Sequence, residues 1–206
     1  MKHSIAARTS PRAPTGDAPH PASRRQRWRL CLALLLCATP LLASAYELEV
    51  SKSRRVLLVR DGQQVKATFQ VALGRGGKGD KNRLGDNKTP IGTYRIVGVS
   101  DSGAFDTFLR LNYPNVKDAF YGLKRALITR RDFDRIVSAL RHNQVPPQNT
   151  RLGGAIGIHG LGEETPEKVH IQNKLDWTQG CIALRNHDLH ALRSYVDVGT
   201  RVVITE

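Results

Sequence analysis

Residues 55–74 contain two apolar segments, one on each side of an Asp61-Gly62 pair. After that pair every second position is apolar, which is the period of a strand with one buried face. An Asp-Gly pair between two such runs is typical of a two-residue hairpin turn. The sequence therefore predicts a β-hairpin here. The alternating apolar positions after the turn are Val65, Ala67, Phe69, Val71 and Leu73.

A helical pattern replaces this alternation in residues 129–142. Thr129, with Asp132 three residues later, has the form of a capping box at the start of a helix. The apolar positions that follow are spaced i, i+3, i+4 and i+7, which is one face of a helix. They are Phe133, Ile136, Val137 and Leu140. A shorter helix, capped by Asn186, is predicted near the C-terminus. Its inward positions are Leu189, Leu192 and Val196.

Other apolar or extended runs predict further strands, which polar segments connect. The predicted strands cover residues 92–100, 106–113, 153–160 and 199–204, and the predicted loops cover residues 74–91 and 161–175. The first loop contains a G-x-G-x-x-G spacing, but no helical pattern follows it, so a dinucleotide-binding turn is excluded. Strands outnumber helices and do not alternate with them as βαβ units. The sequence therefore predicts a mainly β fold with attached helices (α+β).

The N-terminal residues have the pattern of a secretory signal peptide. A basic segment and an apolar run over residues 30–38 precede the small residues Ala43, Ser44 and Ala45. We therefore expect residues 1–45 to be a signal peptide with a long polar leader, and residues 46–206 to be an exported, periplasmic domain. The apolar run is too short to span a bilayer comfortably, so no transmembrane domain is expected after cleavage.

Charge and aromatic content restrict the choice of partner only slightly. The formal net charge is +14, which suits an acidic partner, but only 6% of the residues are aromatic. No basic stripe is interleaved with stacking residues, so we expect no nucleic-acid partner. A monomer is expected.

Cys181 is the one cysteine that would remain after signal cleavage. The chain has three cysteines, and the other two, Cys31 and Cys37, lie in the predicted signal peptide. Exported proteins normally pair their cysteines, and Cys181 would have no intramolecular partner. An odd cysteine in such a chain indicates either intermolecular pairing or a reactive thiol.

His159 is the candidate base for this thiol, because it ends an apolar predicted strand and would be held rigidly. A thiol needs a neighbouring base or a positive field to become a nucleophile. The backbone carbonyl of Gly160 could orient the imidazole, as a carboxylate does in other triads.

The residues before Cys181 predict an oxyanion hole. A tight turn at Gly180 would direct the backbone N–H groups of Gln179, Gly180 and Cys181 toward a reacting carbonyl. A helix beginning after Cys181 would also lower the thiol pKa through its N-terminal partial charge. We therefore expect a depressed thiol pKa.

The other histidines and Trp177 have structural interpretations. His170, His187 and His190 lack the spacing of a metal site, so no metal and no cofactor is expected and they are interpreted as surface residues. Trp177 is interpreted as a core residue rather than as a platform for substrate.

Four segments resemble the L,D-transpeptidase catalytic domain family, also called YkuD-type. They are GDNKTPIGTYRI, IGIHG, TQGCIAL and VDVGTRVVI. The resemblance covers nearly all of residues 46–206, and it is especially close to a subgroup of small exported Gram-negative members. It implies a β-sandwich-like domain that acts on peptidoglycan stem peptides.

The resemblance also implies a mechanism. Cys181 would attack the carbonyl of the L-centre residue that precedes a terminal D-alanine, with His159 as the base and the Gly160 carbonyl orienting it. The thioester would then be resolved by an amine of a second stem peptide, by a lysine of a wall-linked lipoprotein, or by water. Thr178 and Arg185 are the candidate substrate-binding residues.

Two departures from the family pattern leave the reaction subtype open. Many members have histidine where Gln179 stands, and many have arginine where Ala183 stands; Arg185 is the nearest arginine that could compensate. Transpeptidation is the leading interpretation, and hydrolysis that releases lipoprotein or trims stem peptides is the alternative. A wall-binding module without activity and a Cys-His peptidase of unrelated fold are further alternatives.

Overall fold

The computed structural model describes residues 46–206, so the predicted signal peptide lies outside the described residues. The strands are β1 (Glu47–Ser51), β2 (Val56–Asp61), β3 (Gln64–Gln70), β4 (Gly92–Ser102), β5 (Asp106–Leu111), β6 (Gly157–His159), β7 (Ile182–Ala183) and β8 (Arg201–Thr205). The helices are α1 (Val116–Lys124), α2 (Arg130–Arg141), α3 (Pro166–Lys174) and α4 (Asn186–Arg193). The predicted mainly β, α+β fold is confirmed.

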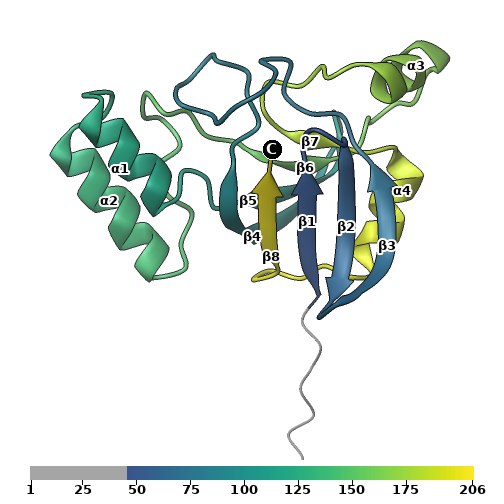
Figure 1. Cartoon of the computed structure of the whole chain (residues 1–206), viewed down its shortest axis with the longest axis horizontal. Helices are drawn as coiled ribbons and strands as arrows, with labels where there is room; N and C mark the ends of the chain where they lie inside the picture. Colours follow the sequence, from purple (N-terminus) through teal and green to yellow (C-terminus); the bar gives the residue numbers. More distant parts are fainter. Residues whose placement is uncertain (1–45) are drawn as a thin grey trace, which may run out of the picture. The chain divides into compact units, whose positions relative to one another are not determined.

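The strands form one mixed sheet in the order β3-β2-β1-β8-β4-β5-β6-β7 (Figure 1). β1 runs parallel to β8 and β6 runs parallel to β7, while the other neighbouring strands are antiparallel. β4 joins two halves of the sheet, because its residues 92–95 pair with β8 and its later residues pair with β5. A register shift between Ile96 and Gly98 lies at this change of partner. A bulge of this kind bends a strand.

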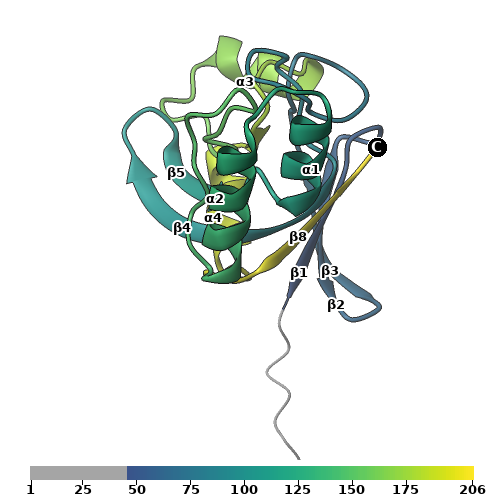
Figure 2. The same ribbon diagram turned by 90° about the vertical axis from the view of Figure 1, so that its left-hand side faces the viewer.

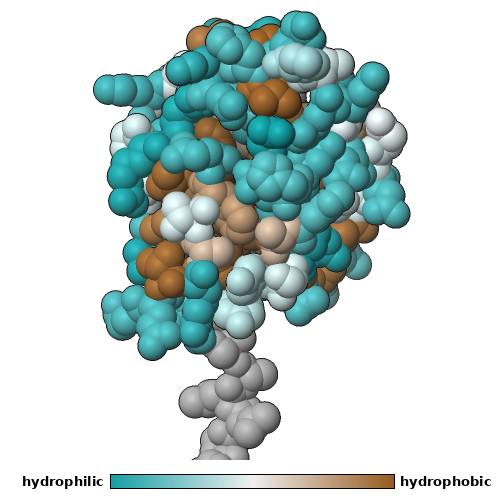
Figure 3. Space-filling view, turned by 90° about the vertical axis from the view of Figure 1, so that its right-hand side faces the viewer, coloured by the Kyte–Doolittle hydropathy of each residue, from teal (hydrophilic) through white to brown (hydrophobic). Residues whose placement is uncertain are grey.

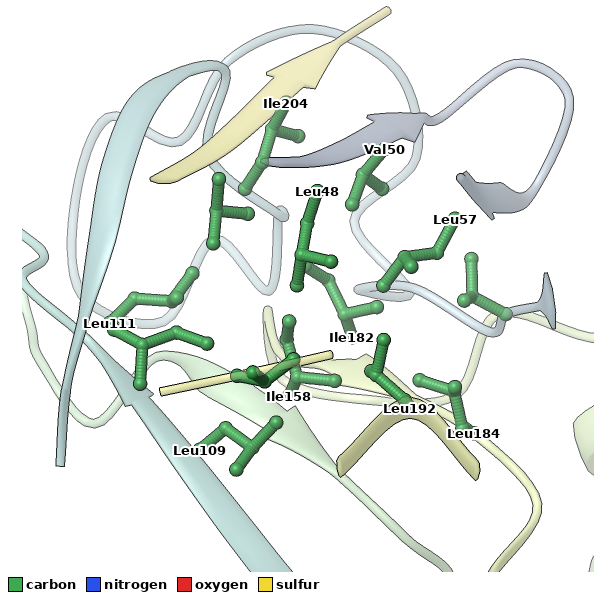
Figure 4. Packing of buried hydrophobic residues seen from close by; sticks show 14 of the residues in the cluster. Leu48, Val50, Leu57, Leu109, Leu111, Ile158, Ile182, Leu184, Leu192 and Ile204 are labelled. Atoms are coloured by element: carbon green, nitrogen blue, oxygen red, sulfur yellow. The ribbon is translucent and has the colours of Figure 1, made fainter. Parts of the chain in front are cut away.

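The two halves of the sheet face each other across the main core, in a sandwich-like arrangement. Leu48, Val50 and Ile204 come from one half, and they point toward Ile158 and Ile182 from the other (Figure 4). All of these side chains are fully or almost fully buried. Burying apolar surface is the dominant favourable term in folding, so this core fixes the strands on which the site stands.

The predicted hairpin and the predicted capped helix are both confirmed. β2 and β3 pair as an antiparallel hairpin around Gly62, which has the positive φ of +56° that favours glycine. Thr129 caps α2, and both hydrogen bonds of the capping box with Asp132 are present. α1 and α2 pack against each other to one side of the sheet (Figure 2), around a second, smaller cluster of buried residues.

Two helices were not predicted. α1 follows a turn and begins with its own capping box between Asn115 and Asp118, a signal present in the sequence. α3 lies inside the segment that was predicted as a polar loop. Thr165 caps it and Pro166 occupies its first turn, which is the favoured place for proline in a helix. Its weak amphipathic pattern explains why apolar periodicity missed it.

The short helix near the C-terminus is confirmed, but its predicted cap is wrong. The N-cap residue of α4 is Arg185, with no capping hydrogen bond from its side chain. The Asn186 side chain instead accepts the Leu161 N–H and donates to the Gly162 carbonyl, so it holds the chain that follows β6. The predicted inward residues Leu189, Leu192 and Val196 are buried.

The face that carries β3, α3 and α4 is mostly hydrophilic, with a smaller apolar area below its centre (Figure 3). Exposed apolar side chains on or beside these elements are Val65, Ile171 and Leu175. None of the helices within residues 46–206 has the length and apolar character needed to cross a bilayer.

Candidate active site

The sheet brings His159 and Cys181 to neighbouring strands. β6 and β7 pair in parallel, with Ile158 opposite Ile182 and His159 opposite Ala183. Cys181 directly precedes β7, so it stands one residue before the paired positions. The side chains of Ile158 and Ile182 are fully buried in the core, and this packing fixes the positions of His159 and Cys181 next to them.

Both residues open into a cavity of about 640 Å³. The cavity is lined by Arg75, Ser100, Asp101, Ser102, Phe105, Phe108, Arg110, Ala155, His159, Trp177, Thr178, Gln179 and Cys181. These residues come from the loop after β3, from the β4–β5 hairpin, and from the segments that contain β6 and Cys181. Segments far apart in the sequence therefore build one concave site of the size that binds small ligands.

The imidazole of His159 is held in one orientation. Its Nδ1 lies 2.7 Å from the Gly160 carbonyl oxygen, which can only accept, so Nδ1 carries the proton and donates. Nε2 is then left as the basic nitrogen. Phe105 packs on the ring, with centroids 4.4 Å apart. Burial lowers the His159 pKa, and the hydrogen bond to Gly160 opposes that shift, so the neutral form is favoured near neutral pH.

The turn before Cys181 is held by Thr178. Its side chain is buried, and its hydroxyl accepts the Gly180 N–H at 3.1 Å and donates to the Cys181 carbonyl at 2.8 Å. The Gly180 N–H is used inside the turn, so it is not a free oxyanion donor, which corrects one prediction. Thr178 also lines the cavity, and its contact with substrate stays a prediction.

Two of the three predicted oxyanion donors are available. Within residues 46–206, the backbone N–H groups of Gln179 and Cys181 donate to no protein acceptor. Gly180 between them has a φ of +130°, and a Cβ there would lie 2.8 Å from the Lys88 carbonyl oxygen. Only glycine meets both conditions, so the turn depends on it.

The thiol of Cys181 is not paired with His159 in this structure. Its Sγ lies 3.4 Å from the Ala155 carbonyl oxygen and donates to it. Burial raises the thiol pKa, against weaker opposing effects of the Gly157 backbone, Lys81 and Arg110. The predicted depressed pKa is therefore wrong in direction. The predicted helix dipole is absent because β7, and not a helix, follows Cys181.

Trp177 belongs to the site and not to the core, contrary to the prediction. It is half-buried, lines the cavity and meets the His159 ring edge-to-face, with centroids 5.9 Å apart. Its Nε1–H donates to Gln172 of α3, whose amide in turn donates to the Ala183 carbonyl. The unpredicted helix α3 therefore supports the site.

Comparison with known proteins agrees with this geometry. The model of the L,D-transpeptidase catalytic domain, YkuD, matches residues 45–204. The chain belongs to this family. None of the curated proteins searched matches the chain.

Solved structures with a similar fold include the helical cell shape determining protein Pgp2 from Campylobacter jejuni. It is 22% identical, with a TM-score of 0.52, and the match covers 79% of this chain and 48% of that one. Bd1075 from Bdellovibrio bacteriovorus is also 22% identical, with a TM-score of 0.48, over 79% of this chain and 48% of that one. L,D-transpeptidase 3 from Mycobacterium tuberculosis is 14% identical, with a TM-score of 0.45, over 79% of this chain and 61% of that one. The chain thus spans about half the length of the first two.

The arginines that line the cavity of this YkuD domain differ from the one that the sequence indicated. Ala183, at the position of the usual family arginine, is fully buried. Arg185 does not line the cavity, because its guanidinium pairs with Glu164 at 3.2 Å. Arg75 and Arg110 line the cavity instead. Strand alternation was the signal for Arg110, since residues 106–113 were predicted to be extended, but no rule pointed to Arg75.

Proposed function

We propose that this chain is an exported cysteine acyl transferase that acts on peptidoglycan stem peptides and carries out L,D-transpeptidation. The observation that supports the proposal most is the shared cavity of Cys181 and His159, with the Nδ1–H of His159 fixed on Gly160. Membership of the L,D-transpeptidase family supports the same class of reaction. The signal peptide pattern of residues 1–45 supports export to the periplasm.

The first half-reaction uses the neutral forms of both residues. Cys181 Sγ attacks the carbonyl carbon of the L-centre residue, and the thiol proton passes to His159 Nε2. A small rotation of the thiol away from the Ala155 carbonyl is needed, since Sγ donates there at rest. The N–H groups of Gln179 and Cys181 would stabilise the oxyanion that forms. The bond to the D-residue then breaks, and its amine leaves with the proton from His159.

The second half-reaction decides the product. His159 takes a proton from an attacking amine, the new amide forms, and the thiol is released with that proton. With water in place of the amine, the product is a shortened stem peptide. Hydrolysis remains the alternative activity. Pgp2 is described as a cell shape determining protein, and we propose that a change in wall cross-linking or stem length gives this chain a related role.

Mass spectrometry of muropeptide products tests the proposal. Purified tetrapeptide muropeptides and lipoprotein-linked peptidoglycan are incubated with the wild type, Cys181→Ala and His159→Ala. Cross-linked dimers are expected from the wild type, and both variants should lose at least about 100-fold in rate. Tripeptide stems or free lipoprotein would instead identify a hydrolase. Products that persist in Cys181→Ala, or no product with any substrate, would reject the cysteine mechanism and favour a binding module.

If no product forms, reaction with a carbapenem shows whether the thiol is unreactive or the substrate is unsuitable. The ring of this β-lactam acylates a nucleophilic thiol, and the intact mass rises by one adduct. We expect one adduct on the wild type and none on Cys181→Ala. An equal adduct on both proteins would mean that another residue reacts.

A further inference from the structure

Arg110 is a half-buried cation in the cavity that has no carboxylate partner within residues 46–206. Its guanidinium lies over the Phe108 ring, 5.3 Å from the centroid. Removing a cation from water is unfavourable unless an anion or several hydrogen bonds compensate. Two other half-buried arginines have such partners: Arg55 pairs with Asp176, and Arg185 with Glu164. Arg110 therefore has the environment of an anion-binding residue without its anion.

Strand geometry directs Arg110 toward the nucleophile. Leu109 and Leu111 of β5 are fully buried in the core, so Phe108 and Arg110 occupy the opposite face. Arg110 pairs with Gly157 of β6, and Cys181 directly precedes β7, the next strand of the sheet. Neighbouring strands are about 4.8 Å apart, so two spacings separate Arg110 from Cys181, roughly 10 Å. An arginine side chain and a bound carboxylate together bridge that gap.

The Phe108 ring lies over the glycine that separates Arg110 from Cys181. A Cβ on Gly157 would lie 2.5 Å from that ring, so β6 contributes no side chain of its own there. On the other side, Arg110 pairs with Gly98 of β4. The aromatic face of Phe108 restricts the plane of the guanidinium, which prepares its paired N–H groups for a carboxylate.

The other cations of the region are less suited to this role. Lys81 is engaged by Asp86 at 2.7 Å. Arg75 lines the cavity, but it is exposed and stands on the loop after β3. Its charge is therefore screened by water. Among the cavity residues that the structure describes, Arg110 combines a strand position, partial burial and a charge without a carboxylate partner.

We propose that Arg110 binds a free carboxylate of the stem peptide next to the scissile bond and thereby selects acidic over amidated stems. This proposal rests on the proposed function, and it identifies the substrate group that the site recognises. Two carboxylates have the right chemistry: that of the terminal D-residue, and that of the D-centre of diaminopimelate. The positive charge of Arg110 also opposes in part the rise in the Cys181 pKa that burial causes.

Three tetrapeptide muropeptides distinguish the two carboxylates. One has both carboxylates free, one carries a carboxamide on the terminal D-alanine, and one carries a carboxamide on the D-centre of diaminopimelate. The wild type is expected to prefer the free form over one of the amides by about 10- to 100-fold in kcat/KM, the range for a hydrogen-bonded charge. In Arg110→Gln that preference should disappear, while the rate on the disfavoured amide changes by less than about twofold. Arg110→Lys should give an intermediate preference, because it keeps the charge without the two-point geometry.

Controls separate binding from folding and from thiol reactivity. Arg130→Gln removes an exposed arginine of α2 that pairs with Asp134, and it should behave as the wild type. Thermal unfolding and alkylation by neutral iodoacetamide show whether Arg110→Gln keeps its fold and its thiol. An equal loss of kcat/KM on all three substrates would overturn the proposal. So would a wild-type preference that Arg75→Gln, and not Arg110→Gln, removes. Absence of any product from the wild type would instead reject the proposed function, and the role of Arg110 with it.

Discussion

The sheet half that carries the site and the α1–α2 pair are both held by buried apolar side chains, but only one of them shapes the cavity. β4, β5 and β6 supply cavity residues, and the turn before Cys181 supplies others. α1 and α2 pack around their own cluster, and none of the cavity residues comes from either helix. Similar burial should therefore give similar stability in the two regions but very different effects on catalysis.

A matched pair of isoleucines gives the largest expected contrast. Ile158 belongs to β6 and directly precedes His159, and Ile136 belongs to α2 and lies in the cluster between α1 and α2; both are fully buried. Ile158→Ala and Ile136→Ala should each lower the free energy of unfolding by about 2–5 kcal/mol. Only Ile158→Ala should slow carbapenem acylation strongly, by about 10- to 100-fold, because a displacement near 1 Å costs that much.

Chemical denaturation and intact-mass kinetics check this pair. The kinetics are recorded well below both unfolding midpoints, so that each variant is folded. If acylation slows strongly and equally in both variants, the helices are coupled to the site. If acylation slows little in both variants, His159 keeps its position without Ile158.

A pair of threonines gives the next contrast. Thr178→Val keeps the side-chain shape but leaves the Gly180 N–H and the Cys181 carbonyl without the Thr178 hydroxyl. It should cost about 1–3 kcal/mol of stability and loosen the turn, which we expect to slow acylation about 10-fold. Thr129→Val removes the cap of α2 instead, at a cost of about 1 kcal/mol, with no change in acylation. Unchanged acylation in folded Thr178→Val would mean that Gly180 alone sets the turn.

The same two regions show what the sequence made predictable. Period-two alternation predicted the β2–β3 hairpin, and a capping box with helical spacing predicted α2, because both signals are local. α3 was missed because its apolar period is weak, although Thr165-Pro166 marks its start. Near the site, Cys181 and His159 were candidates from the sequence. The hydrogen bonds of the Thr178 hydroxyl and the direction of the shift in the thiol pKa depend on the folded arrangement around Cys181, which no local pattern encodes.

The smallest expected effect is on pH dependence, and it distinguishes two ways of activating Cys181. Burial raises the pKa of the thiol and lowers the pKa of His159, so both groups are neutral near pH 7. Alkylation of Cys181 by iodoacetamide should then rise with pH to a midpoint above roughly 8.5, the value of a free cysteine. His159→Ala should leave this midpoint nearly unchanged, since the imidazole acts only when the proton is transferred.

The raised thiol pKa also makes the free energy of unfolding depend on pH. A thiol whose pKa is raised by folding contributes stability that is complete below the unfolded pKa and is lost as pH rises through the folded pKa. The free energy of unfolding of the wild type should therefore fall above roughly pH 8.5, and it should fall less in Cys181→Ala. Ile136→Ala, in the region without the site, should keep the wild-type slope. An alkylation midpoint below roughly 8.5 that rises in His159→Ala would mean that a thiolate–imidazolium pair forms at rest, and that the thiol turns from Ala155 toward His159 in solution.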